Sequence, residues 1–243
     1  MSTKEAILKQ IQAAMEQEPR INLHRHPIRM ELGNDGALTL EGEVEDIAAK
    51  KLAMELAGAV SGVRGVIDRL RVAPAERRGD GAIRDEVCRF LLEEPTLQNC
   101  SLRAWSKGRR ESLREAGAES AGTIEVAVDE GVITLDGEVI SLSHKRMAGV
   151  LAWWTPGCRD VVNGLEVVPP EQDNDDELAD ALRLVWEKDP LLADADLLRA
   201  SARDYVLTLE GTVPREAEKK AAELDAWYLF GVDKVINRIE VPG

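Results

Sequence analysis

The 243-residue chain is 44% hydrophobic and 31% charged, and its formal net charge is −14. This length suffices for two or three small domains, each with a hydrophobic core of its own. The negative charge disfavours nucleic acid as a partner, and no apolar run approaches the 18 residues that a membrane-spanning helix needs.

Motifs that carry catalytic chemistry are absent from the sequence. It has no G-x-S-x-G nucleophile elbow, no glycine-rich phosphate loop and no zinc-ligand spacing, so we expect no catalytic residue, no cofactor and no metal site. Three widely spaced cysteines indicate reduced thiols, and residues 1–19 are typical of a helix rather than of a signal peptide. The sequence therefore predicts a non-enzymatic, cytoplasmic protein, with peripheral membrane association left open.

The first predicted elements set a pattern for the whole chain. An amphipathic helix ends before Pro19, and a half-buried strand follows at 28–32. The turn sequence Gly-Asn-Asp-Gly suits a tight hairpin and leads into a second strand at 38–43. A second helix then stops at Gly62, and a last strand ends at Val72.

The same pattern recurs twice along the chain. Three 37-residue segments, 36–72, 131–167 and 205–241, align without a gap and share a Thr-Leu-acid-Gly motif and a glycine after the helix. An amphipathic helix that ends near a proline precedes each segment. We therefore predict an α+β fold of three tandem α-β-β-α-β units, each a three-stranded mixed sheet with two helices on one face.

Linkers rich in proline and charge, at 73–81 and 169–177, separate the three units. The expected domains are residues 1–75, 80–170 and 174–243. The second domain is longer because of an insertion at about 103–122, whose glycines, serines and charges predict a surface loop or a short helix.

The repeated motifs resemble those of the BON family, the bacterial OsmY and nodulation domains. The likeness rests on the Thr-Leu-acid-Gly strand, on alanines four apart in the second helix, and on the endings GVRGVIDRLRV, GCRDVVNGLEV and GVDKVINRIEV. The first unit departs from the pattern with Asp68, where the others have Asn163 and Asn237. The resemblance implies non-catalytic modules linked to osmotic or envelope stress, to phospholipid binding and, in one cytoplasmic relative, to potassium sensing.

Large aromatic residues stand at the end of the second helix in only two of the units. Trp153 and Trp154 align with Trp227 and Tyr228, whereas the first unit has glycine and alanine there. Since the first unit has no rings at these positions, the fold itself does not require them. We expect these four residues to contact a sister domain or a protein partner. A position in their own domain's core and a membrane or ligand patch are the alternatives.

Charged residues suggest two further sites. The insertion carries a basic set with one aromatic residue: Trp105, Lys107, Arg109, Arg110 and Arg114. This set is a candidate contact for phosphate headgroups, with the acidic third domain as the alternative partner. Carboxylates recur at the end of the second strand and are candidate ligands for a hard cation, or else a solvated surface: Glu41, Glu43, Asp136, Glu138 and Glu210. His144 opens the middle unit's second helix beside Lys145 and Arg146, and we expect this to be a solvated helix face.

Three functions follow as hypotheses. The leading one is a stress-linked binding or scaffold protein that acts through protein–protein contacts or self-association. The second is a peripheral protein that binds anionic phospholipid, and the third is a cytoplasmic sensor of a cation such as potassium.

Overall fold

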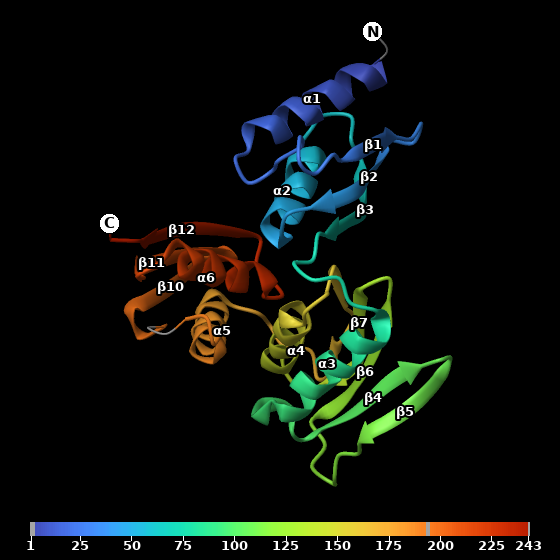
Figure 1. Cartoon of the computed structure of the whole chain (residues 1–243), viewed down its shortest axis with the longest axis vertical. Helices are drawn as coiled ribbons and strands as arrows, with labels where there is room; N and C mark the ends of the chain where they lie inside the picture. Colours follow the sequence, from blue (N-terminus) through green and yellow to red (C-terminus); the bar gives the residue numbers. More distant parts are fainter. Residues whose placement is uncertain (1–2, 193–194, 243) are drawn as a thin grey trace. The chain divides into compact units, whose positions relative to one another are not determined.

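The structure, a computed structural model, describes residues 3–192 and 195–242 (Figure 1). The chain divides into two compact units, Met1–Pro74 and Ala75–Gly243. The first unit contains one of the sequence repeats and the second contains the other two.

The first unit has the predicted order of elements. These are α1 (Thr3–Gln17), β1 (Arg29–Leu32), β2 (Ala37–Val44), α2 (Ile47–Gly58) and β3 (Gly65–Val72). Strands β1 and β2 form an antiparallel hairpin, and β2 pairs with β3 in parallel. Leu38, Leu40 and Leu70 are fully buried, whereas Glu41 on the opposite sheet face is exposed. One face of the sheet is therefore the core face, as the alternation of residues predicts.

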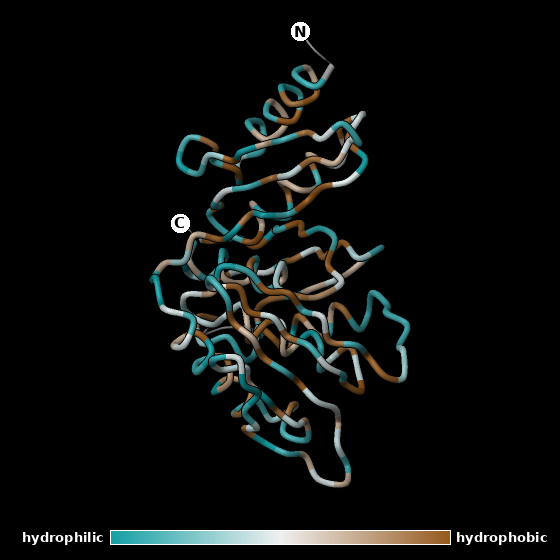
Figure 2. Tube along the Cα trace, turned by 90° about the vertical axis from the view of Figure 1, so that its right-hand side faces the viewer, coloured by the Kyte–Doolittle hydropathy of each residue, from teal (hydrophilic) through white to brown (hydrophobic). Residues whose placement is uncertain are grey.

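Both helices of the first unit contribute to its core. Figure 2 shows hydrophobic and hydrophilic residues alternating around the turns of α1, and its Ile11 and Met15 are fully buried. Helix α2 begins after Asp46, whose carboxylate accepts a hydrogen bond from the main-chain N–H of Ala49 at 3.0 Å. The small buried side chain of Ala53 allows α2 to lie close against the sheet.

Asp68, the departure from the repeated asparagine, makes an ion pair. Its carboxylate lies 2.9 Å from the ammonium group of Lys50, a side chain that is almost completely buried. In the second repeat, Asn163 instead donates its side-chain amide to the main-chain carbonyl of Lys145 at 2.8 Å, and Asn237 makes the same kind of bond in the third. Lys145 of the second repeat aligns with Lys50 of the first. Because Asn163 carries no charge, the Lys145 ammonium is not held in the same ion pair and is available for another contact.

The second unit begins with the longer, middle repeat. Its elements are α3 (Asp80–Glu93), η1 (Pro95–Leu97), β4 (Cys100–Ser106), β5 (Arg109–Arg114), β6 (Gly122–Asp129), β7 (Val132–Val139), α4 (Leu142–Trp154), β8 (Asp160–Asn163) and β9 (Glu166–Val167). The strand order is β5-β4-β6-β7-β8, and β9 also pairs with β7. The hairpin β6–β7 and the parallel partners of β7 reproduce the sheet of the first repeat.

The expectation of a loop or short helix at 103–122 is wrong. The insertion contains a β-hairpin, β4–β5, and β4 extends the sheet by pairing with β6 in parallel. Leu102 and Ala104 of β4 are buried, and the two-residue turn Lys107–Gly108 has positive φ angles of 50° and 74°. These φ angles suit the tight turn of a two-residue hairpin. The middle sheet therefore has six strands rather than three.

The third repeat returns to the short form. It consists of α5 (Asp175–Lys188), η2 (Ala195–Leu197), β10 (Leu198–Arg203), β11 (Val206–Thr212), α6 (Glu216–Tyr228) and β12 (Lys234–Glu240), with strand order β10-β11-β12. Trp186 of α5 is fully buried and donates its indole N–H to the carbonyl of Ala222 at 3.1 Å. The predicted α+β plan of repeated units is confirmed. Among the described residues, no helix is long and apolar enough to cross a membrane.

Candidate functional site

The second and third repeats meet within the second unit, where α4 contacts both α5 and α6. The Trp153 and Tyr228 rings stack, with centroids 5.4 Å apart and planes inclined by 12°. Trp154 donates its indole N–H to the Asp225 carboxylate at 2.8 Å. Trp227 is 1% exposed and lies in the interior. Because adjacent helical residues point about 100° apart, Trp227 and Tyr228 take different environments. Three of the four predicted aromatic residues thus meet at one junction.

Arg146 is the polar anchor of this junction and is 2% exposed. One of its guanidinium nitrogens lies 2.6 Å from both carboxylate oxygens of Asp173, in the linker, and its Nε donates to the carbonyl of Phe230 at 3.1 Å. The Lys145 ammonium lies 3.9 Å from the centre of the Phe230 ring. A Cβ at Gly231 would lie 2.9 Å from the Asp173 carboxylate, so a glycine there leaves room for the pair. The expected solvated position of Arg146 is therefore wrong.

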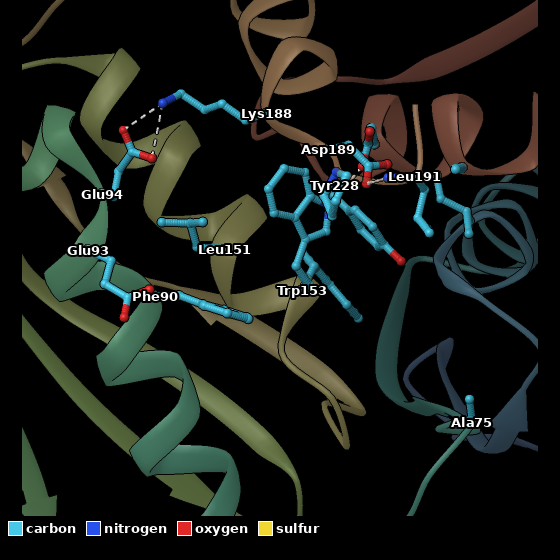
Figure 3. Close-up of a pocket in the computed structure, with 15 residues that line it drawn as sticks. Ala75, Phe90, Glu93, Glu94, Leu151, Trp153, Lys188, Asp189, Leu191 and Tyr228 are labelled. Atoms are coloured by element: carbon cyan, nitrogen blue, oxygen red, sulfur yellow. Dashed lines mark hydrogen bonds and ion pairs between the residues drawn. The ribbon is translucent and has the colours of Figure 1, made fainter. Parts of the chain in front are cut away.

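A cavity of about 790 Å³ lies at the junction (Figure 3). Its walls are mainly apolar: Phe90 comes from α3, Leu151 and Trp153 from α4, and Tyr228 from α6. Leu191, which follows α5, also lines the cavity and is 64% exposed. A cavity of this size, with apolar walls and a few polar groups, is typical of a binding site.

An ion pair joins the two repeats beside the cavity. The Lys188 ammonium, at the end of α5, lies 3.0 Å from the carboxylate of Glu94, which follows α3 (Figure 3). Burial acts to raise the pKa of Glu94, but hydrogen bonds from Thr96 and Lys188 outweigh burial and hold the pKa below its usual value. Glu94 therefore stays ionised at neutral pH and keeps this contact.

Two buried aspartates of the third repeat also line the cavity. Asp225 and Asp189 are 2% and 7% exposed. Burial and the neighbouring Asp189 charge raise the pKa of Asp225 well above its ordinary value, although the N–H of Trp154 acts in the opposite direction. The cavity thus combines apolar walls with carboxyl groups held away from bulk water.

The predicted headgroup residues all lie on or beside the β4–β5 hairpin: Trp105, Lys107, Arg109, Arg110 and Arg114. Arg110 pairs with Glu125 at 2.8 Å, and the indole N–H of Trp105 lies 3.3 Å from the same carboxylate. Arg114 donates to three main-chain carbonyls. Lys107 and Arg109 lie at the hairpin tip, next to its turn. Two of the four basic side chains are therefore engaged within the protein.

The sequence profile of the BON domain matches three segments of the chain, residues 3–74, 109–169 and 174–243. The chain belongs to the BON domain family. The resemblance noted from the repeated motifs is thereby confirmed. BON domains are associated with stress-related and phospholipid-binding proteins, and the family is generally non-catalytic.

Solved structures of CdsD, a structural protein of the type III secretion system of Chlamydia trachomatis, are similar to this BON protein. The structure of the CdsD C-terminal domain is 16% identical, with 98% of each chain covered and a TM-score of 0.23. A second CdsD structure is 17% identical, covering 96% of this chain and 91% of the other, also with a TM-score of 0.23. No curated protein matches. These values are too low to support an inference about function.

The carboxylates considered as cation ligands are distributed over the three BON repeats. Glu41 lies 3.5 Å from Arg29, and Glu210 lies 3.7 Å from Arg238, both in exposed ion pairs. Within residues 3–192 and 195–242, no group of three or more His, Cys, Asp or Glu side chains is placed to hold a metal ion. Cation sensing therefore stays a hypothesis without a defined site.

Arg146 and Asp225 are the residues of the BON junction that sequence reasoning missed. A signal for Arg146 exists in the sequence, because Val150, Trp153 and Trp154 follow it at spacings of four, seven and eight residues. This spacing places the four residues on one stripe of α4. Asp225 gives no such signal, since an aspartate in a charged helix is ordinarily exposed.

Proposed function

We propose that the chain is a non-catalytic binding protein whose second and third BON repeats form one binding body. The cavity of about 790 Å³ carries this proposal, because it joins apolar walls from both repeats to a few ionisable groups. The family association supports a setting in osmotic or envelope stress. The partner is a protein that inserts an apolar side chain into the cavity.

Charge favours a basic segment of that partner. Glu93, Glu94 and Asp189 line the cavity, its lysine, Lys188, is paired with Glu94, and the chain as a whole carries a net charge of −14. Anionic phosphate groups are repelled by such a surface, whereas lysine or arginine beside an apolar anchor residue complements it.

Phospholipid binding is the second candidate, and it rests on the hairpin tip. Lys107 and Arg109 are exposed there, beside the half-exposed ring of Trp105. The support is weaker than for the cavity, because Arg110 and Arg114 are engaged within the protein. Co-sedimentation with anionic vesicles at low salt tests it, and no difference between wild type and Lys107→Ser/Arg109→Ser removes it.

A photo-crosslinking experiment tests the leading proposal. The photoreactive residue p-benzoylphenylalanine replaces Leu191, which lines the cavity and is 64% exposed, in the full chain expressed in its source cells. Leu197 is the matched control, since it is 58% exposed and does not line the cavity. We expect a discrete protein adduct from position 191 and none from 197.

A second substitution fills the cavity, to test whether the adduct at position 191 depends on it. Leu224→Trp places a larger side chain in the lining, and it abolishes the adduct at position 191 if the partner inserts there. Equal crosslinking from positions 191 and 197, or an adduct that survives Leu224→Trp in a folded protein, contradicts the proposal.

A further inference from the structure

Asp225 and Asp189 form an unusual pair at the junction. Oδ1 of Asp225 accepts the indole N–H of Trp154 from the second repeat at 2.8 Å. Oδ2 of Asp225 is buried and accepts no hydrogen bond from the described residues. The carboxyl group of Asp189 is 7% exposed, lines the same cavity as Asp225 and acts to raise the pKa of Asp225. One oxygen of Asp189 accepts the main-chain N–H of Leu191 at 2.8 Å, which fixes Asp189 after the end of α5.

Two buried carboxylates cannot hydrogen-bond to each other, because ionised carboxylates are acceptors only. They also repel, and burial makes the repulsion stronger than it is in water. A single proton removes both problems, since a protonated carboxyl donates through its O–H and carries no charge. The geometry therefore requires either a proton on the pair or an opening of the junction to water.

We propose that Asp189 and Asp225 form a proton-binding site that ties the third repeat to the second. Asp225 keeps the proton, donates a hydrogen bond through its O–H to the Asp189 carboxylate and accepts a hydrogen bond from the indole N–H of Trp154. Loss of the proton leaves two buried charges beside the cavity, and these are relieved when the repeats separate and water reaches them. The ligand of this site is a proton, so the closed arrangement of the two repeats depends on pH. This proton site needs no partner in the cavity.

The groups around the pair do not replace the proton. From α4 the pair receives the N–H of Trp154, which already serves Oδ1 of Asp225. From α5 the nearest cation in sequence is Lys188, which lies 3.0 Å from Glu94. Glu93, Glu94 and Tyr228 are the other ionisable groups that line the cavity, and none of them is a cation.

The sign of the pH effect follows from linkage. The folded protein keeps a proton on Asp225 in a pH range where an unfolded or water-exposed aspartate, with a pKa near 3.9, has lost it. The folded state therefore binds more protons, and the stability of the junction falls as pH rises from about 4 through the raised pKa of Asp225. Above that pKa Asp225 is ionised in both states, so it adds no further pH dependence to the stability of the junction.

Asp225→Asn in the full chain tests the inference, because an asparagine imitates the protonated acid. Its amide oxygen accepts from Trp154 and its amide N–H donates to Asp189. Hydrogen exchange of peptides from the ends of α4 and α6 is compared between variant and wild type at each pH from 5 to 9. We expect wild-type protection, relative to Asp225→Asn, to fall as pH rises across this range, about tenfold for each pH unit below the raised pKa of Asp225.

Two further variants complete the test. Asp189→Asn keeps an oxygen for Leu191 and donates to Asp225, so it also removes the pH dependence. Asp180→Asn, on the exposed side of α5 with 69% of its side chain accessible, follows wild type at every pH. A constant ratio of wild type to Asp225→Asn between pH 5 and 9 overturns the inference. So does an Asp225→Asn protein that is less protected than wild type at every pH or does not fold.

Discussion

Replacing Arg146 with methionine removes the polar contacts of this side chain at the junction and keeps most of its apolar contacts. Methionine retains an apolar stem but loses the contacts to both Asp173 oxygens at 2.6 Å and to the Phe230 carbonyl at 3.1 Å. Removing one partner of a buried ion pair costs about 3–5 kcal/mol. The Asp173 side chain is 18% exposed and regains some hydration, so we expect the lower end, about 3 kcal/mol. For a unit of this size that corresponds to roughly 6–12 °C in Tm.

Tryptophan fluorescence during urea unfolding of the full chain measures this effect. All five tryptophans lie in Ala75–Gly243, so their signal reports the second unit alone. Arg183→Met is the matched control, because Arg183 is 52% exposed and makes one ion pair with Asp180, worth less than about 0.5 kcal/mol. An Arg146→Met protein that loses no more stability than Arg183→Met refutes the assignment of Arg146 as the anchor.

Two other predictions concern each unit separately. Asp68→Asn removes the charge opposite the buried Lys50 ammonium at 2.9 Å, and should destabilise the first unit by about 1–2 kcal/mol because Asp68 is partly exposed. Hydrogen exchange in α2 should rise while tryptophan fluorescence stays unchanged, and equal exchange in both proteins contradicts it. Burial raises the pKa of the Cys88 thiol to about 11, so roughly 0.1% is thiolate at pH 8. A thiol reagent at pH 8 should therefore label Cys88 only after denaturant is added, and rapid labelling of the folded protein contradicts this.

Most of the fold is predictable from the sequence because the same pattern occurs three times. Alternation in the strands, the Thr-Leu-acid-Gly motif and the glycine after α2, α4 and α6 each recur, and each has a local physical cause. The hairpin in the insertion lacks a copy elsewhere in the chain for comparison. Its charged β5 reads as a loop, although the alternation of Leu102 and Ala104 and the Lys107–Gly108 turn indicate a hairpin.

The candidate site is only partly predictable, since it is made of contacts between repeats. Comparison of the repeats singles out Trp153, Trp154 and Tyr228, but not what each ring touches. The proposed pairing of Asp189, just after α5, with Asp225, in the last turn of α6, joins residues 36 positions apart. No periodicity within one element reports such a contact, because it depends on how two helices pack.

The differences between the repeats indicate which residues dock the second repeat against the third. Where the second repeat has Arg146, Trp153 and Trp154, the first has Lys51 and a glycine–alanine pair at the aligned positions. A lysine lacks the planar guanidinium group that reaches Asp173 and Phe230 together, and glycine or alanine offers no ring for stacking. The positions that the repeats share form the strands, the turns and the helix ends. Arg146, Trp153 and Trp154, which the first repeat lacks, make contacts between the second and third repeats from one stripe of α4.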